Sequence, residues 1–250
     1  MNVDDLARRL FEAIQNRRAT TPDPDLDDPE TAYRVQERLV ELLGGTPKAL
    51  KLGLTSRAKQ TQMNVSEPLY GWLVDWMQLD IGQPLTCSEL IQPRAEPEIG
   101  FLLGKKLAGP NLTATHVMAA TDAVFCAFDI LDSRYAGYRF TLPHVIADDA
   151  SAGRFLLGDP VDPTGIDLRT VGCVFTKNGE TIATAAGAAV LGHPAAAVAW
   201  AANRLTQRGH HLEPGTIVLA GALTEAVPIQ PGDTVTVELD RIGTLTLPCR

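Results

Sequence analysis

The chain has 250 residues, of which 45% are apolar and 21% are charged, a balance typical of a globular protein with a sizeable buried core. Its formal net charge of −8 argues against nucleic acid or an anionic membrane as the main partner. An anionic substrate would need a local cationic site, which a bound metal ion could supply.

The four cysteines are Cys87, Cys126, Cys173 and Cys249. They are far apart and form no C-x-x-C pair, so the spacing suggests neither a zinc site nor a disulfide framework. We therefore expect reduced thiols and a cytoplasmic protein. The N-terminus lacks an apolar signal region, and Gly192-His193-Pro194 interrupts the alanine-rich residues 185–202, so we expect no membrane segment.

The first 46 residues are predicted to form a small helical N-terminal cap. Apolar residues recur at helical spacing from Val3 to about Arg18, which predicts an amphipathic helix. Pro29 suits the first turn of a second helix that runs to about Leu43, and Gly44-Gly45 ends it. Residues 47–250 have short apolar runs and frequent turn residues, and we expect them to form the catalytic domain.

A lysine stands in the middle of the first predicted strand, residues 49–54. Two interpretations of Lys51 are open. It could face solvent from an edge strand, or it could lie in a pocket near a metal ion. In the second case, burial and the nearby cation would both lower its pKa and make it a usable proton carrier. Residues 55–65 are predicted to form a short helix.

Two glutamates follow at i and i+2 in the segment Arg94-Ala95-Glu96-Pro97-Glu98-Ile99-Gly100-Phe101. In an extended strand such residues point to the same face, so Glu96 and Glu98 are predicted to lie side by side. Two like charges that close repel unless one is protonated or a cation lies between them. A solvated strand face is the plainer interpretation. The other is a site for a divalent cation that prefers carboxylate oxygens.

An aspartate interrupts the next apolar strand, residues 124–131, which follows a helix predicted from Thr113 to Ala123. A buried aspartate is costly unless it is paired or ligating, so Asp129 is the candidate third metal ligand. Asp132 is the alternative ligand. At the strand end it would instead pair with Arg134 or with backbone donors.

The remaining third of the chain is predicted to be rich in strands. Residues 146–155 combine small polar groups with one arginine, which suits either a carboxylate-binding loop or a plain surface loop. Asn178-Gly179 predicts a hairpin, and Pro194 begins a helix that reaches Leu205. Further strands are expected at residues 216–220, 235–239 and 245–247. Thr224 follows the first of these and could be presented to a ligand.

Six short motifs follow one another in an order typical of one enzyme group. They are Lys51-Leu52-Gly53-Leu54-Thr55-Ser56, Glu96-Pro97-Glu98-Ile99-Gly100-Phe101, Asp129-Ile130-Leu131-Asp132-Ser133-Arg134, Ala147-Asp148-Asp149-Ala150-Ser151, Leu191-Gly192-His193-Pro194 and Gly221-Ala222-Leu223-Thr224. From Leu6 onward the chain resembles the hydratase and decarboxylase group of the fumarylacetoacetate hydrolase superfamily. The resemblance implies an α+β fold, a mixed β-roll with a small helical N-terminal part.

The resemblance also implies a magnesium or manganese ion on three carboxylates. Glu96 and Glu98 match two of them. The third is usually glutamate, whereas this chain has Asp129, which is shorter by one methylene and must draw the metal closer or insert a water. The group usually has A-D-N where this chain has Ala147-Asp148-Asp149.

The stretches at residues 53–59 and 132–140 resemble the decarboxylases more than the hydratases. Such an enzyme removes carbon dioxide from 2-oxo-3-hexenedioate, a 2-oxo diacid, during meta-cleavage degradation of aromatic compounds. Arginine suits two-point carboxylate binding. The cationic residues that would suit a diacid are Arg57, Lys59, Arg134, Arg139 and Arg154.

The expected functional residues follow from this resemblance. Lys51 is the expected catalytic residue, and Glu96, Glu98 and Asp129 are the expected metal ligands. The residues expected to bind substrate are Ser151, Arg154, Thr224, Arg134, Leu73 and Asp75. A homo-oligomer is expected, with a possible complex with the pathway hydratase. Two alternatives stay open, which are a 2-hydroxypenta-2,4-dienoate hydratase and a non-catalytic metal-bearing subunit that supports a hydratase.

Overall fold

The computed structural model describes residues 1–62 and 65–250, without the side chains of Ala58, Lys59 and Gln62. Two helices form the N-terminal part, α1 (Val3–Asn16) and α2 (Pro29–Leu43). The Asn2 and Asp28 side chains accept hydrogen bonds from the first free N–H groups of α1 and α2. Helix α1 ends two residues before the position expected from the sequence, because Arg17 adopts the left-handed conformation.

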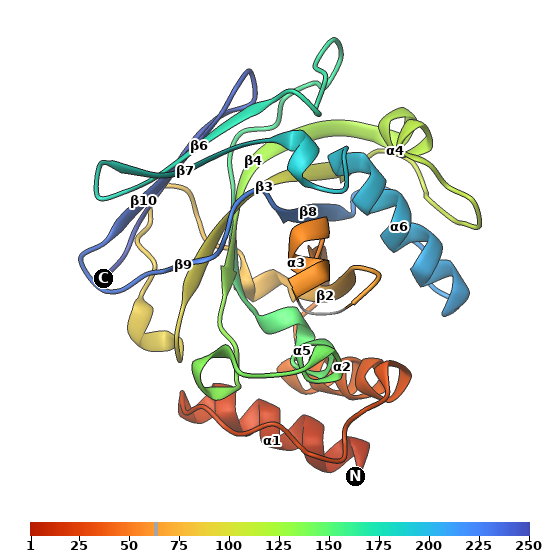
Figure 1. The fold of residues 1–250 in the computed structure, drawn as a ribbon, viewed down its shortest axis with the longest axis vertical. Coiled ribbons are helices and arrows are strands. Elements are labelled where there is room, and N and C mark those ends of the chain that lie inside the picture. Colours follow the sequence, from red (N-terminus) through yellow and green to blue (C-terminus); the bar gives the residue numbers. More distant parts are fainter. Residues whose placement is uncertain (63–64) are drawn as a thin grey trace.

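A seven-stranded mixed sheet forms the centre of the molecule, with the strand order β2-β1-β8-β3-β4-β5 and β9 paired to β3 (Figure 1). The strands are β1 (Pro47–Gly53), β2 (Leu69–Val74), β3 (Arg94–Leu103), β4 (Thr121–Leu131), β5 (Ala152–Leu157), β8 (Ile217–Ala222) and β9 (Val227–Pro228). Only the β1–β8 pair is parallel among these described pairs. The α+β mixed β-roll expected from the sequence is confirmed.

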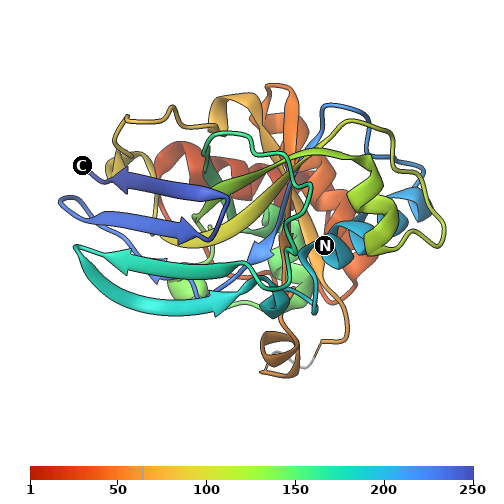
Figure 2. The same ribbon diagram turned by 90° about the horizontal axis from the view of Figure 1, so that it is seen from above.

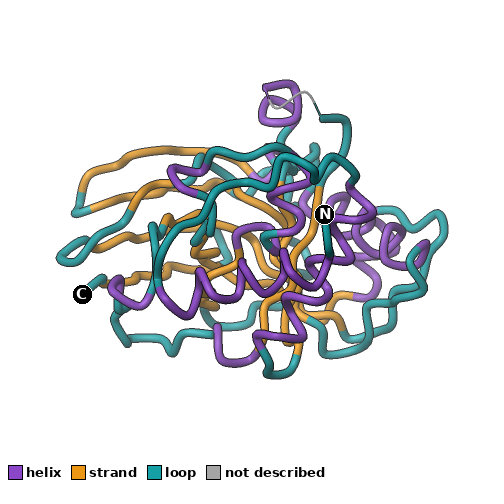
Figure 3. Tube along the Cα trace, turned by 90° about the horizontal axis from the view of Figure 1, so that it is seen from below, coloured by secondary structure: helices purple, strands orange, loops and turns teal. Residues whose placement is uncertain are grey.

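A second, antiparallel sheet has the order β11-β10-β6-β7. Its strands are β6 (Gly172–Lys177), β7 (Glu180–Ala186), β10 (Thr234–Leu239) and β11 (Gly243–Pro248), and β6 and β7 flank the predicted Asn178-Gly179 turn. The rings of Phe128 on β4 and Phe175 on β6 lie 5.8 Å apart, so the two sheets share one apolar core. Figures 2 and 3 show the second sheet projecting to one side, away from most of the helices.

The other helices are short except one. They are α3 (Arg57–Gln62), α4 (Ala114–Ala120), α5 (Leu142–Ala147) and α6 (Pro194–Gln207), and 3-10 turns include η1 (Asp75–Met77), η2 (Cys87–Glu89) and η4 (Asp149–Ser151). The sequence pattern missed α5 and β5, because six-residue elements with small residues carry little periodicity. No helix of the described part is long and apolar enough to cross a membrane.

A buried glutamine links helix α2 to strand β2 and helix α5. The Gln36 amide donates hydrogen bonds of 2.8 and 2.9 Å to the carbonyls of Tyr70 and Ile146. The Tyr33 ring stacks on Tyr70 at 4.6 Å between centroids. The sequence-based division at residue 46 stays a prediction, and these contacts join the two sides of it. They also hold β2 and α5 against one another.

The turn η4 has an unusual backbone. Asp149, Ala150 and Ser151 all have positive φ, which is costly for residues with a side chain. The turn packs on Gly71 of β2, where an added Cβ would lie 2.6 Å from the Asp149 carbonyl oxygen. The Asp149 Oδ1 atom accepts a 2.8 Å hydrogen bond from the Trp72 N–H. Burial raises the pKa of Asp149 to about 7.

This raised pKa predicts a stability that falls as the pH rises. Between pH 4 and 7 the folded chain retains a proton on Asp149 that the unfolded chain has lost, so the free energy of unfolding decreases through this window by up to about 4 kcal/mol. Asp149→Asn should remove that loss, and its advantage over the wild type should grow towards pH 7. Urea unfolding from pH 4 to 8 measures this. Asp25→Asn, on an exposed loop, is the control, and parallel curves for Asp149→Asn and the wild type would contradict the prediction.

Candidate active site

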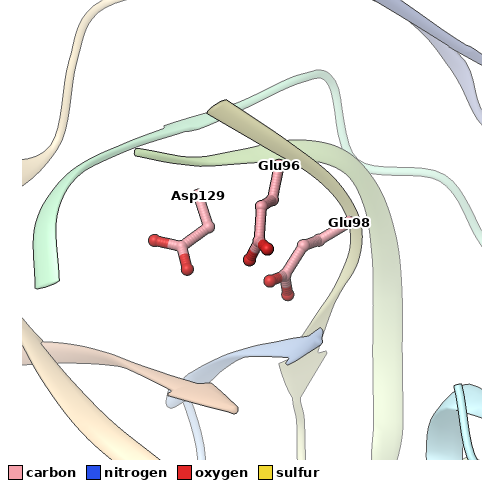
Figure 4. A group of neighbouring side chains, drawn as sticks. All are labelled: Glu96, Glu98 and Asp129. Carbon is pink, nitrogen blue, oxygen red and sulfur yellow. The ribbon is translucent and has the colours of Figure 1, made fainter. Parts of the chain in front are cut away.

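Three acidic side chains converge where β3 and β4 pair. Glu96 and Glu98 are two residues apart in β3, so their side chains point to the same face of the strand. Glu96 pairs directly with Asp129 in the antiparallel register. One carboxylate oxygen from each lies within 4.8 Å of the other two. All three residues are buried, and Figure 4 shows their carboxylates turned towards one another. The side-by-side arrangement of Glu96 and Glu98 that the sequence predicted is confirmed, and the solvated-face interpretation is wrong.

The electrostatics of this cluster call for a cation. Burial raises the pKa of Glu98 well above its usual range, and Asp129 and Glu96 raise it further. The Glu98 Oε1 atom is buried and has no hydrogen-bond partner among the described residues. Buried carboxylate oxygens at this spacing are the donor set that magnesium and manganese prefer. The residues present therefore fit a divalent cation.

A glycine holds Glu98 in place from the neighbouring strand. The Gly221 N–H donates a 2.6 Å hydrogen bond to Glu98 Oε2. Gly221 has φ +108°, and a Cβ there would lie 2.0 Å from the Thr55 hydroxyl oxygen. Only glycine fits this position without a shift, because both its backbone conformation and its space exclude a side chain. The sequence motif around Gly221 thus serves the carboxylate cluster through its backbone.

Lys51 lies beside the cluster rather than in solvent. Strand β1 pairs with β2 on one side and β8 on the other, so it is not an edge strand. Lys51 is 1% exposed, and its Nζ lies 2.5 Å from Asp129 Oδ2. The solvent-facing interpretation of Lys51 is therefore wrong. Its role as a proton carrier stays a prediction, for which the position is suitable.

A cavity of about 430 Å³ opens beside these residues. Lys51 and Glu96 line it together with Arg94, Thr55, Ser56 and Ser151. The other lining residues are Leu52, Gly53, Leu54, Leu69, Leu131, Tyr138, Phe140, Val145, Ala150, Ala222 and Ala226. The cavity therefore combines a charged end with largely apolar walls, as small-molecule sites commonly do.

Of the residues expected to bind substrate, the structure places Ser151 at the cavity and the others elsewhere. Ser151 lines the cavity, and Thr224 lies between the lining residues Ala222 and Ala226 without lining it. Leu73 is buried in an apolar cluster on the same face of the sheet as Lys51 but does not line the cavity, and Asp75 borders a different hollow near Lys48. Their contact with a ligand stays a prediction.

Arg134 and Arg154 have partners outside this cavity. The buried Arg134 guanidinium donates a 2.5 Å hydrogen bond from Nε to the Asp148 carboxylate and others to the Asp132 and Ala152 carbonyls. Arg154 lies over the Trp76 ring and borders a separate hollow of about 180 Å³. The structure thus gives Arg134 a structural task, and neither arginine is brought to the carboxylate cluster.

The alternative ligand and the other cationic residues also lie apart from the cluster. Asp132 accepts hydrogen bonds of 2.8 to 3.0 Å from the Ile91 and Gln92 N–H groups, as expected for a carboxylate at a strand end. Arg57 and Arg139 are exposed. The Lys59 side chain is outside the described residues.

Sequence reasoning gave no role to Arg94, whose side chain lines the cavity. The signal was present, because Arg94, Glu96 and Glu98 follow one another at i, i+2 and i+4 and share one face of β3. Tyr138 lines the same cavity and contacts Arg94. It lies in a loop, where no periodicity indicates which way a side chain points.

Known proteins resemble this chain in sequence and in fold. A family profile described as fumarylacetoacetate (FAA) hydrolase C-terminal matches residues 80–249. A 4-oxalocrotonate decarboxylase from Pseudomonas sp. (strain CF600) is 45% identical over 82% of this chain and 80% of that protein. A 2-hydroxyhexa-2,4-dienoate hydratase from Comamonas testosteroni is 37% identical over 98% of this chain and 96% of that protein.

The solved structures agree with these sequence matches. The 4-oxalocrotonate decarboxylase from Pseudomonas putida G7, complexed with magnesium and adipate, superposes with a TM-score of 0.95. That protein is 38% identical to this chain, and the match covers 99% of this chain and 97% of the other. The sequence profile, the relatives and the fold lead to one assignment. The chain belongs to the fumarylacetoacetate hydrolase family.

Proposed function

We propose that the protein is a metal-dependent decarboxylase that converts 2-oxo-3-hexenedioate into 2-hydroxypenta-2,4-dienoate and carbon dioxide in the meta-cleavage degradation of aromatic compounds. The observation that carries the proposal is the carboxylate cluster with Lys51 beside it, at the end of a cavity with apolar walls. Relatives with 42% and 45% identity are named 4-oxalocrotonate decarboxylase, which supports the same reaction.

In this proposal Glu96, Glu98 and Asp129 would hold magnesium or manganese. When bound, the ion supplies a Lewis acid for the 2-oxo acid end of the substrate. The chain itself orients the substrate, since the charged end of the cavity receives the 2-oxo acid and the apolar walls receive the carbon chain. Cleavage of the C5–C6 bond releases carbon dioxide, and the bonding electron pair passes along the conjugated chain to the C2 oxygen.

Lys51 is the residue that we propose moves a proton. Its Nζ lies at the charged end of the cavity, where the electron pair from C5 arrives at the substrate oxygen. It can hold a proton for the C2 oxygen and thereby favour the dienol product. Leucine, valine and phenylalanine side chains line the walls. In this proposal they would limit access of water to C4, the carbon to which a hydratase adds water, and so favour release of the product over hydration.

A hydratase is the second candidate. Hydratases are 35% to 39% identical to this chain over most of its length, and the same residues could protonate a dienol and direct water to it. A non-catalytic subunit is the weakest candidate, because a scaffold needs neither a buried lysine nor its carboxylate partner at a cavity. Supplying 2-oxo-3-hexenedioate with magnesium decides between them. We expect carbon dioxide release. A protein that releases no carbon dioxide but adds water to 2-hydroxypenta-2,4-dienoate would be a hydratase.

We also propose a cytoplasmic homo-oligomer that can associate with the pathway hydratase. The described cysteines are free and buried, which suits a reducing compartment. Oligomerisation rests on family resemblance. Light scattering at micromolar concentration should give a mass at least twice that of the chain. A lone monomer would contradict the homo-oligomer, and unchanged mass on adding the hydratase would contradict the complex.

The first prediction for the site concerns Glu96. Glu96→Gln should abolish binding of the divalent ion and activity, because the remaining carboxylates carry too little charge to hold the ion. Calorimetric titration with magnesium and manganese measures this. Glu180→Gln, an exposed change on β7, is the control and should bind like the wild type. Unchanged affinity in Glu96→Gln would remove Glu96 from the metal site.

The second prediction concerns Lys51. Lys51→Met should leave metal binding nearly intact and lower kcat by a factor on the order of 10² to 10⁴, the usual worth of a positioned acid or base. Lys48→Met provides a matched control, since Lys48 is on the same strand but exposed. Steady-state kinetics at saturating metal measure both parameters. A rise in KM with kcat unchanged would show that Lys51 only holds the substrate.

A further inference from the structure

A second cation, Arg94, lines the same cavity as Lys51. Arg94 is on the same face of β3 as the two glutamates, two residues before Glu96. Its backbone is paired on both sides, to Leu131 of β4 and Pro228 of β9, so its position along the strand is fixed. Arg94 is partly buried and lines the cavity. The strand therefore presents an arginine and the carboxylate cluster to the same space.

A tyrosine holds the Arg94 guanidinium in place. The central carbon of the guanidinium lies 4.0 Å from the centroid of the Tyr138 ring. The Tyr138 hydroxyl accepts a hydrogen bond from the Ser133 N–H and donates one to the Gln92 carbonyl, so the ring itself is anchored. Stacking on a ring leaves the edge of the guanidinium, which carries its N–H donors, free to meet a ligand.

Among the described residues, no acidic side chain neutralises this guanidinium. Within the part of the chain that the structure describes, no carboxylate lies within ion-pair distance of Arg94. By contrast, Lys51 has Asp129 and Arg134 has Asp148. A partly buried, positioned and unpaired arginine that faces a cavity is suited to bind a carboxylate in two-point fashion.

We infer that Arg94 binds the carboxylate at the far end of a dicarboxylate substrate and selects diacids over monoacids. The inference rests on the proposed function for the placement of the 2-oxo acid end at Glu96 and Lys51. Two residues of strand separate the Arg94 and Glu96 Cα atoms by about 7 Å. The five carbon–carbon bonds of a six-carbon diacid span roughly 6 Å. The length of such a diacid is therefore comparable with the spacing of the two residues along β3, as the inference requires.

The position of Arg94 also limits how strongly it can act on the chemical step. A carboxylate that leaves as carbon dioxide loses its charge, so a strong ion pair at that end would stabilise the substrate more than the transition state. Arg94 is partly exposed, and water screens its attraction for the carboxylate. We therefore expect Arg94 to contribute to substrate binding rather than to turnover, with its loss raising KM and leaving kcat unchanged or higher.

The test compares two ligands that differ only at the far end, 2-oxoadipate and 2-oxohexanoate. Calorimetry at saturating magnesium gives both dissociation constants. In the wild type the diacid should bind more tightly. Arg94→Gln should raise the dissociation constant of 2-oxoadipate by roughly tenfold or more, which is the contribution expected of a charge-assisted pair. The dissociation constant of 2-oxohexanoate should change by no more than about twofold. Arg94→Lys should recover part of the difference, and Arg8→Gln, an exposed change on α1, should behave like the wild type.

Other outcomes overturn the inference. Equal weakening of both ligands in Arg94→Gln, with unchanged magnesium affinity, would place Arg94 at the 2-oxo acid end. Unchanged binding of both would give it only a structural role. The inference and the proposed function fail separately. If carbon dioxide is released but the variant keeps the preference for the diacid, only the role of Arg94 is wrong. If Arg94 sets that preference but no carbon dioxide is released, only the reaction is wrong.

Discussion

The repulsion between three buried carboxylates is the constraint on which the rest of the structure depends. Holding Glu96, Glu98 and Asp129 within 4.8 Å of one another costs free energy that an apolar interior cannot offset by itself. The fold meets this cost with one positive charge, one backbone N–H dipole and the pairing of two strands. Lys51 approaches from β1, the Gly221 N–H from β8, and the antiparallel pairing of β3 with β4 prevents the side chains from separating.

The surrounding elements can be understood as supports for that arrangement. Strand β8 lies between β1 and β3, so it brings the lysine strand and the glutamate strand into one sheet. The Gln36 amide fixes β2 to α5, and the turn η4 is then pressed against Gly71. Arg134 and Asp148 form a buried pair behind this turn. A residue far from the cavity, such as Gln36, therefore contributes to the position of Ser151 within it.

The sequence was informative where a periodic pattern contained a charged residue that is costly to bury. Glu96, Glu98 and Asp129 interrupt apolar strands, so both their direction and their need for a partner could be inferred. The fold followed from the order of six motifs. The spacing of Arg94 from Glu96 indicated a shared face of the strand, but the sequence did not indicate the contact of Arg94 with Tyr138, because that contact joins β3 to a loop. It also suggested Arg154 by composition, whereas the side chain lies over Trp76. The sequence shows which residues are charged, but tertiary packing determines where their side chains lie.

The short distance between Lys51 and Asp129 has a consequence for how the site can be altered. With Nζ 2.5 Å from Oδ2, the ammonium shares Asp129 with any cation that the three carboxylates would hold. Asp129 therefore belongs both to the proposed metal ligands and to the surroundings of the proposed proton carrier. A change at this one aspartate would act on both, so the two parts of the site cannot be varied independently through it.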